Sequence, residues 1–362
     1  EMSFNKDTLK KKLQTICAEY EIKAQNASLE ATGHGFKIIK EKEGVTVDYD
    51  KTVEQLYTYV TEKWNKKANI KLTATTTVSK PKYTTEDCEK VSNEPMGSYT
   101  TEFSVGSSYA NRNLNIQNGA KLINGAVVYP GEQYSCNENL YPWTEDNGWH
   151  PAGTYVDGGV QDSLGGGICQ VSSTLYNALL RAEIKVVKRF PHSMAVGYVP
   201  LSADAALAGD YKDLVFENDT DAPIYVQGIY NSGGSITFNI YGHDTRKAGH
   251  SVKYESKTVK TTPVKTQTKK DSSKPVGYSE VESSGHVGYV AELWKITYEN
   301  GKQVSKELIH TSTYAMSPTI VVKGTKKAST TTKKDDSDKD DKKSSEKTTK
   351  KSTSSKKSKK SE

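Results

Sequence analysis

Near its centre the chain reads Gly165-Gly166-Gly167-Ile168-Cys169-Gln170-Val171-Ser172-Ser173-Thr174-Leu175-Tyr176, and much of its architecture follows from this segment. Three consecutive glycines allow a tight turn and a close approach of the backbone to another group. Apolar residues then recur at helical spacing, at Val171, Leu175, Ala178, Leu179 and Ala182. The pattern predicts an amphipathic helix with Cys169 in its first turn.

A thiol at this place has a chemical consequence. The positive end of a helix dipole and nearby unpaired N–H groups favour the thiolate, which is the nucleophilic form of cysteine. His192 is a candidate partner, because Pro191-His192-Ser193 opens a strand-like run over 194–199. A cysteine at a helix start and a histidine at the edge of a following sheet can form a nucleophilic pair. Spacing alone does not bring the two together.

Composition excludes one class of partner. Residues 324–362 hold 14 lysines against 7 acidic residues and carry a net charge of +7, whereas the rest of the chain has 36 basic and 37 acidic residues, net −1. The remainder is therefore nearly neutral, which argues against nucleic acid as its main partner. The lysine-rich end is typical of a solvated, disordered tail.

The four cysteines, Cys17, Cys88, Cys136 and Cys169, match no metal-binding spacing and are too sparse for a disulfide scaffold. Cys17 lies on the apolar stripe of an N-terminal helix. For Cys17 and Cys136 we expect a packing role in the core. No segment is long and apolar enough to span a membrane, and no signal peptide is visible. The chain opens in polar sequence, so we expect a fragment that lacks its native start.

The 362 residues suffice for two or three domains, and we predict an α+β fold. We expect a small α+β module over 1–97 and a central domain over 98–245, in which the Cys169 helix packs on an antiparallel sheet. Residues 246–275 are Lys/Thr/Ser-rich and are expected to be a linker, with Lys257 to Lys274 as the best candidate and strand as the alternative for part of it. An all-β module with a hairpin at Asn300-Gly301 should follow over 276–323, and a disordered tail over 324–362.

The central segment also carries a family resemblance. It rests on Arg112, Asn115, Asn124-Gly125, Pro130-Gly131-Glu132, Gly165 to Ser172, Leu175-Tyr176-Asn177, His192-Ser193, Asp204-Ala205 and Asp213-Leu214. On these residues, 98–245 resembles the VanW domain, which is associated with vancomycin resistance and has members that act as L,D-transpeptidases. Residues 1–97 resemble the peptidoglycan-binding module that often precedes VanW domains. Residues 276–323 resemble the five-glycine (G5) extracellular module.

The resemblance implies a function. The implied protein is an L,D-transpeptidase, which forms 3-3 cross-links in peptidoglycan through a cysteine thioester, releases D-alanine and uses no cofactor. Cys169 would be the nucleophile, and His192 the general base and then the acid. The implied partners are peptidoglycan stem peptides and glycan. The implied location is extracellular, in the cell wall or at the outer face of a Gram-positive membrane, with a membrane tether in the full-length chain.

The group that orients the imidazole stays open among Asp204, Asp213, Asn218 and a backbone carbonyl. If 194–199 paired with 214–218 as a hairpin, His192 would lie nearer Asn218 than Asp213. Backbone N–H groups around Cys169 and Gln170 are the expected oxyanion donors, with Gly167 and Ser193 also near the site.

Two further readings are weaker. His150 could join Cys169 and His192 in a zinc site, but nothing in the spacing supports a metal. Trp143, Trp149 and Tyr155 could line a cleft for sugar or stem peptide, and ordinary packing explains them equally well.

Two rival functions also remain. A cysteine endopeptidase or carboxypeptidase of peptidoglycan would form the same acyl-enzyme and pass it to water instead of an amine. A non-catalytic wall-binding protein would use its flanking modules alone.

Overall fold

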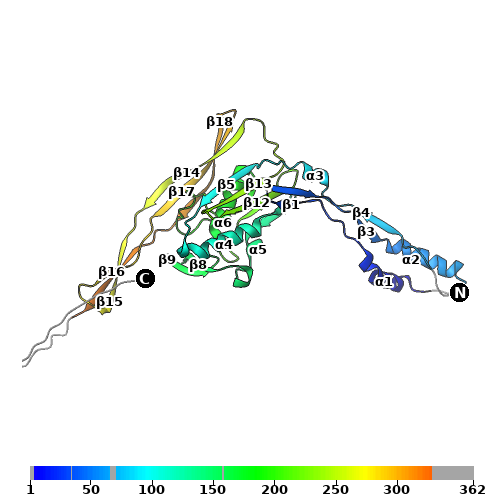
Figure 1. Cartoon of the computed structure of the whole chain (residues 1–362), viewed down its shortest axis with the longest axis horizontal. Helices are drawn as coiled ribbons and strands as arrows, with labels where there is room; N and C mark the ends of the chain where they lie inside the picture. Colours follow the sequence, from blue (N-terminus) through cyan, green and yellow to red (C-terminus); the bar gives the residue numbers. More distant parts are fainter. Residues whose placement is uncertain (1–3, 34, 66–70, 157–158, 328–362) are drawn as a thin grey trace, which may run out of the picture.

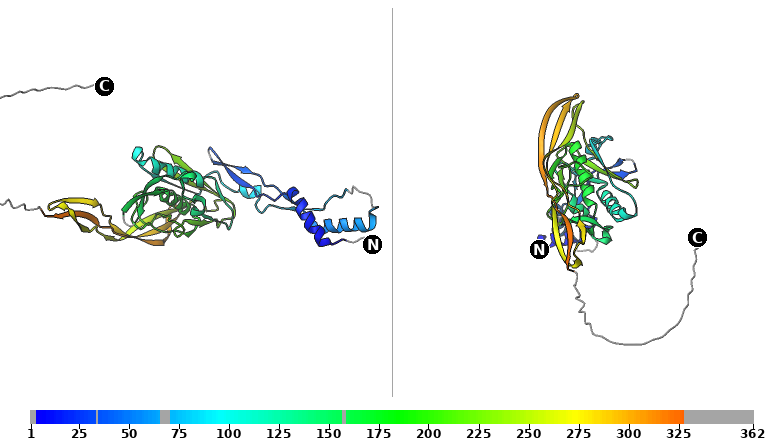
Figure 2. Two further views of the ribbon diagram at one scale, coloured as in Figure 1. Left: turned by 90° about the horizontal axis from the view of Figure 1, so that it is seen from below. Right: turned by 90° about the vertical axis from the view of Figure 1, so that its left-hand side faces the viewer.

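A computed structural model describes residues 4–33, 35–65, 71–156 and 159–327, and it shows an elongated chain with three successive parts (Figures 1 and 2). A helical N-terminal part lies at one end, a central domain lies in the middle, and long strands run from the central domain to the other end. The mixture of helices and antiparallel sheets confirms the predicted α+β class.

The N-terminal part combines paired helices with two short, two-stranded antiparallel sheets. Its elements are α1 (Lys6–Cys17), η1 (Ala18–Tyr20), β1 (Ser28–Thr32), β2 (Gly35–Ile39), β3 (Gly44–Val47), α2 (Tyr49–Thr58), η2 (Tyr59–Lys63), β4 (Thr76–Ser79) and α3 (Thr85–Glu89). Strand β1 pairs with β2, and β3 pairs with β4. The ring of Phe36 in β2 lies 5.1 Å from that of Tyr225 and 5.6 Å from that of Tyr241. Strand β2 is thereby packed against the central domain, while α1 and α2 lie at the outer end (Figure 1).

One expectation for this part is wrong. Cys17 ends α1, a helix with no buried residue, and its side chain is only partly buried. Helix α1 packs on α2, and this pairing leaves none of the side chains of α1 buried.

The central domain packs helices on an antiparallel sheet, as predicted. Its elements are β5 (Gly97–Glu102), η3 (Ser107–Tyr109), α4 (Ala110–Ile123), β6 (Ala126–Val128), β7 (Gln133–Ser135), α5 (Cys136–Leu140), η4 (Glu145–Asn147), β8 (Pro151–Val156), β9 (Gly159–Leu164), α6 (Ile168–Ala182), β10 (Lys185–Lys188), β11 (Val215–Glu217), β12 (Ile224–Asn231) and β13 (Ser235–Tyr241). The main sheet has the order β5-β13-β12-β6, a second sheet has the order β10-β11-β7, and β8 and β9 form a hairpin. Helix α6 packs on β5 and β13, and α4 packs on β12.

Helix α6 forms as its sequence predicts and is the centre of the core. Val171, Leu175 and Leu179 are completely buried, and burying each such side chain contributes about 1.5–3 kcal/mol. Cys136 is also fully buried in this core, as expected.

The glycines before α6 meet two separate demands. Gly167 caps the helix with φ +109°, a conformation that favours glycine. A Cβ on Gly166 would lie 2.5 Å from the carbonyl oxygen of Ala152 in β8, so this position allows only glycine without a shift of the hairpin.

The C-terminal part consists of two three-stranded sheets. Its strands are β14 (His250–Thr262), β15 (Thr266–Pro275), β16 (Ser279–Ser283), β17 (Gly288–Glu299), β18 (Lys302–Tyr314) and β19 (Thr319–Lys326). The orders are β14-β17-β18 and β15-β19-β16, with β15 and β19 parallel. Strands β17 and β18 are joined at Asn300-Gly301, both with positive φ, so the predicted hairpin is confirmed.

The linker expected over 246–275 is wrong, because most of that segment is strand β14 and strand β15. Nearly all side chains of β15 are exposed, and in β14 the alternation of partly buried and exposed side chains is confined to the first residues, from His250 to Tyr254. The pattern that marks a half-buried strand is therefore short in β14 and missing in β15. Pairing with β17 holds β14 as a strand, and pairing with β19 holds β15 as a strand, although few of their side chains are buried.

Two other expectations concern irregular segments. Residues 194–199 form no strand and do not pair with 214–218; β11 pairs instead with β10 and β7. Strand β19 continues to Lys326, into the first residues of the expected tail, and residues 328–362 lie outside the described structure. Among the residues that the structure describes, no helix is long and apolar enough to cross a membrane.

Candidate active site

Cys169 lies in the first turn of α6 and lines a cavity of about 740 Å³. Its side chain is half-buried, so the sulfur is neither sealed in the core nor fully in solvent. The backbone N–H of Leu207 approaches Cys169 Sγ at 3.4 Å, a contact that favours the thiolate.

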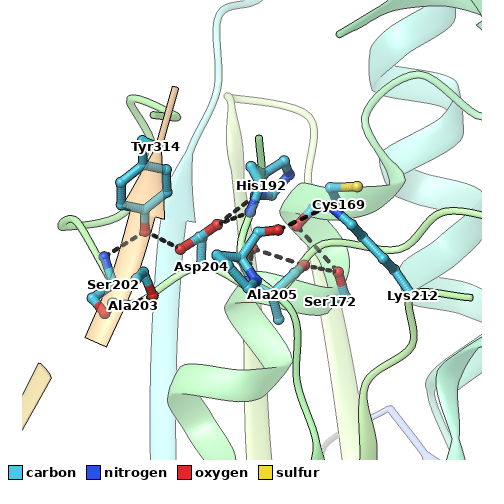
Figure 3. A network of polar contacts seen from close by, with 12 residues as sticks. Cys169, Ser172, His192, Ser202, Ala203, Asp204, Ala205, Lys212 and Tyr314 are labelled. Carbon is cyan, nitrogen blue, oxygen red and sulfur yellow. Dashed lines mark hydrogen bonds and ion pairs between the residues drawn. The ribbon is translucent and has the colours of Figure 1, made fainter. Parts of the chain in front are cut away.

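His192 and Asp204 complete a line of groups that leads away from the sulfur (Figure 3). The Nδ1 of His192 lies 2.6 Å from Asp204 Oδ2, and its Nε2 lies 3.5 Å from the hydroxyl of Tyr198. The backbone N–H of His192 donates to the same carboxylate oxygen at 2.7 Å. Because Nδ1 faces the carboxylate, Nε2 is the ring nitrogen left for the Tyr198 hydroxyl and for Cys169, which lines the same cavity. From sulfur to imidazole to carboxylate, the groups have the arrangement of a nucleophile, a general base and a carboxylate that orients the base.

The polar face of α6 determines where Asp204 lies. Ser172 Oγ donates to the carbonyl of Ala205 at 2.7 Å, and Ser173 Oγ accepts from the Ala205 N–H at 2.9 Å. Asn177 Nδ2 donates to the carbonyl of Ala203 at 2.7 Å. The helix that carries the cysteine therefore also holds both neighbours of Asp204 in place.

Burial and charge oppose each other at all three groups. Burial would raise the pKa of Asp204, but hydrogen bonds from His192 and the charge of Arg189 outweigh it and lower the pKa to about 2. Burial would lower the pKa of His192, but its bonds to Asp204 and Cys169 raise the pKa to about 9. Burial would also raise the pKa of Cys169, and the contact with His192 nonetheless lowers it. Both shifts, the lowered pKa of the thiol and the raised pKa of the imidazole, favour a thiolate–imidazolium pair over the neutral pair.

Two residues that the sequence reasoning missed hold the carboxylate from its other side. Arg189 NH2 donates to Asp204 Oδ1 at 2.7 Å, and the hydroxyl of Tyr314 donates to the same oxygen. Arg189 stands three residues before His192, but no motif marks it. Tyr314 is 110 residues from Asp204 in sequence, and only the folded chain brings them together.

The other two orienting candidates lie elsewhere. Asp213 accepts from Ser135 Oγ at 2.6 Å and from the Asn137 N–H at 3.0 Å, at the start of α5. Asn218 is fully buried and donates to the carbonyls of Val128 and Ala222. Both hold loops in place and neither contacts His192, because the segments expected to pair beside the histidine do not form a hairpin.

The residues expected near the site, Gly167, Gln170 and Ser193, differ in whether they line the cavity or are held by other contacts. The Gln170 N–H donates to the carbonyl of Gly167, so it is already engaged. The Gln170 side chain is buried and accepts from Arg112 NH2 at 2.7 Å, which holds the guanidinium beside the cavity. Gly167 and Ser193 both line the cavity, as expected. Of the two expected oxyanion donors, the Cys169 N–H is the one for which the described residues provide no backbone partner.

The aromatic candidates differ in position. Trp143 lines the cavity, whereas Trp149 is fully buried in the core. The side chain of Tyr155 lies outside the described structure. Within the described ranges, no three His, Cys, Asp or Glu side chains gather closely enough to hold a metal ion.

Two curated proteins are similar to this chain. One, the "Uncharacterized protein YoaR" of Bacillus subtilis, is 37% identical over 164 residues, which cover 45% of this chain and 53% of that protein. The other, the "Vancomycin B-type resistance protein VanW" of Enterococcus faecalis, is 28% identical over 116 residues, 31% of this chain and 42% of that protein. The chain therefore spans about half the length of the curated relatives that it matches. A solved structure titled "IgA1 Protease G5 domain structure" is 30% identical, covers 23% of this chain and 96% of its own, and has a TM-score of 0.17.

Three family models match successive parts of the chain. The family described as "Putative peptidoglycan binding domain" matches residues 1–69, and the family described as "G5 domain" matches residues 253–326. Between them, the family described as "VanW like protein" matches residues 111–241, which contain α6, Cys169, His192 and Asp204. The central domain of this chain thus matches the VanW family, with a match to a peptidoglycan-binding module before it and to a G5 domain after it.

Proposed function

We propose that this protein is an L,D-transpeptidase, which forms 3-3 cross-links in peptidoglycan through a thioester on Cys169. One observation carries the proposal. Cys169, His192 and Asp204 are aligned at the edge of a cavity of about 740 Å³, with the pKa of the thiol lowered and that of the imidazole raised to about 9. This is the charge state that an acyl-transferring cysteine requires.

The first half of the reaction forms the acyl-enzyme. The Cys169 thiolate attacks the carbonyl carbon between the third residue of a donor stem and its terminal D-alanine. The developing oxyanion accepts a hydrogen bond from the Cys169 N–H at the head of α6. The carbon–nitrogen bond then breaks, and the His192 imidazolium gives its Nε2 proton to the departing amine of D-alanine.

The second half transfers the acyl group. The side-chain amine of another stem attacks the thioester carbonyl, neutral His192 takes the proton from that amine, and the thiolate leaves. Asp204 keeps Nδ1 of the imidazole paired throughout, so that the same nitrogen serves both steps. Water in place of the amine would make the protein a carboxypeptidase or endopeptidase, by the same acyl-enzyme.

The flanking modules support a place in the cell wall. A peptidoglycan-binding module and a G5 domain border the VanW domain, and one relative is named for vancomycin resistance. We accordingly propose stem peptides and glycan as partners, and an extracellular location at the wall.

The test is incubation of the protein with disaccharide-tetrapeptide, followed by mass spectrometry. The expected product is a dimer that has lost one D-alanine, absent with Cys169→Ala and present with Cys17→Ala, a matched change at another partly buried cysteine. Tripeptide without dimer would instead assign a hydrolase. No product, together with undiminished binding to cell walls, would assign a non-catalytic wall-binding protein.

A further inference from the structure

One face of strand β18, in the G5 domain, lies against the loop that carries Asp204. His310, Ser312 and Tyr314 alternate along the strand and therefore project from the same face. Ser312 and Tyr314 are 1% and 2% exposed, so this face is as closed as the interior of the central domain.

Tyr314 has the most direct contact. Its hydroxyl accepts from the Ser202 N–H at 2.6 Å and donates to Asp204 Oδ1 (Figure 3). The hydroxyl thus ties the carboxylate to the backbone two residues before it. His192 uses the other carboxylate oxygen, Oδ2, so Tyr314 fixes the rotation of the carboxylate without competing for the imidazole.

Ser312 and His310 extend the same contact. Arg189 NH1 donates to Ser312 Oγ at 2.8 Å, while its NH2 holds Asp204. His310 Nδ1 lies 3.1 Å from Ser202 Oγ, and its Nε2 lies 2.8 Å from the hydroxyl of Tyr176 in α6. Both side chains connect β18 to groups that adjoin Asp204 or the cysteine helix.

The residues after β18 form part of the cavity wall. The Ala315 N–H donates to the carbonyl of Ser193 at 2.6 Å, immediately after His192 in sequence. Ala315, Met316 and Ser317 line the same cavity as Cys169. A substrate bound there would contact the G5 domain as well as the VanW domain.

We propose that the G5 domain is a component of the Cys169 site, in which Tyr314 is a positioning residue for Asp204 and residues 315–317 form one wall of the substrate cavity. The VanW domain alone then holds an incomplete site, and the two domains act as one catalytic unit. The inference rests on the proposed function for its meaning in catalysis, but the contact between Tyr314 and Asp204 can be tested on the thiol alone.

The test compares Tyr314→Phe with Tyr254→Phe in the full chain. Tyr254, in β14, is also a G5 tyrosine whose hydroxyl donates to the central domain, at the Leu180 carbonyl near the other end of α6. Tyr314→Phe loses the two interdomain hydrogen bonds of its hydroxyl, with Ser202 and Asp204, Tyr254→Phe loses one, and each variant keeps its ring. The two readouts are the midpoint of the pH dependence of Cys169 alkylation by iodoacetamide, and kcat and KM for cross-linking.

We expect Tyr314→Phe to raise the alkylation midpoint by about half a pH unit or more, because a less constrained Asp204 holds the imidazole less well. We also expect kcat to fall about tenfold with KM nearly unchanged, whereas Tyr254→Phe should change neither quantity. Equal behaviour of the two variants would overturn the inference. A shifted midpoint in a protein whose wild type makes no cross-links would refute the proposed function and leave the positioning role of Tyr314 standing.

Discussion

At the scale of the single residue, Cys169 is distinguished from the other cysteines by what surrounds its sulfur. Burial raises the pKa of Cys88 to about 11, and burial likewise raises that of Cys136. Burial acts in the same direction on Cys169, yet the neighbouring His192 lowers its pKa. A charged partner, and not exposure or place in a helix alone, accounts for the difference.

A first prediction follows for the pH dependence of the thiol. The thiolate–imidazolium pair forms above the lowered pKa of Cys169 and persists until the pH rises through about 9, where His192 loses its proton. Alkylation of Cys169 should therefore have its midpoint at a lower pH than alkylation of Cys88. In His192→Ala only the Leu207 contact still opposes burial, and the rate at pH 7 should fall at least about tenfold, the effect of one pKa unit on the thiolate fraction. Peptide mass mapping gives the rate for each cysteine, with Cys88 as the slow internal reference. Equal rates in wild type and His192→Ala would disprove the pair.

A second prediction compares Asp204 with Asp213, the two aspartates that the sequence offers as groups to orient His192. Asp204→Asn keeps the shape of the side chain but removes the charge that holds His192, so kcat should fall about 100-fold or more. Asp213→Asn is the matched control, because its contacts are with Ser135 and Asn137. It should retain most of the activity and lose only stability. Steady-state cross-linking rates and thermal melts distinguish the two, and a similar loss of kcat in both would remove Asp204 from the mechanism.

At the scale of the element, the sequence could predict α6 but not the loop that faces it. The stripe from Val171 to Ala182 is local and periodic, so it specifies a helix and places Cys169 at its start. The loop around Asp204 has no regular structure, because its order comes from side chains of α6 such as Ser172 and Asn177. Such contacts have no period that a sequence can show. From the sequence alone, Asp204 could not be preferred to Asp213 or Asn218 as the group that orients His192, and the fold makes that distinction.

A third prediction concerns the turn between β9 and α6. In Gly166→Ala the new Cβ would lie 2.5 Å from the Ala152 carbonyl oxygen, a backbone atom that cannot rotate away. We expect a loss of about 1–3 kcal/mol in the free energy of unfolding, together with slower alkylation of Cys169 as the helix start moves. Denaturant unfolding measures the first effect. Gly197→Ala is the control, since a Cβ there meets nothing within 4 Å, and a Gly166→Ala protein as stable as that control would contradict the crowding at Ala152.

At the scale of the whole molecule, α6 is held at both ends by the G5 domain. Near the N-terminal end of α6, Tyr314 donates to Asp204, and Ser312 accepts from Arg189, which also holds Asp204. At its C-terminal end, Glu183 lies 2.7 Å from His250 Nε2 and 2.6 Å from Lys295 Nζ, both on strands of that domain. These interdomain contacts join residues far apart in sequence, so the expectation of separate modules joined by a linker could not anticipate them.

The pH dependence of the second contact is the last prediction. Hydrogen bonds to Glu299 and Glu183 raise the pKa of His250 above 6.5, while hydrogen bonds and charges from Lys295 and His250 overcome burial and lower the pKa of Glu183 below 4.5. A raised histidine pKa stabilises the fold fully below pH 6.5 and ceases to do so as the pH rises through the folded value. Arg246, 3.6 Å from Glu183, stays charged throughout and preserves part of the contact at high pH. The midpoint of thermal unfolding of the wild type should therefore exceed that of His250→Gln by a few degrees near pH 5.5, and the gap should close toward pH 9. A difference in midpoint that is constant across this pH range would show that the imidazole of His250 contributes packing and not charge. The contact of Glu183 with His250 would then not respond to pH.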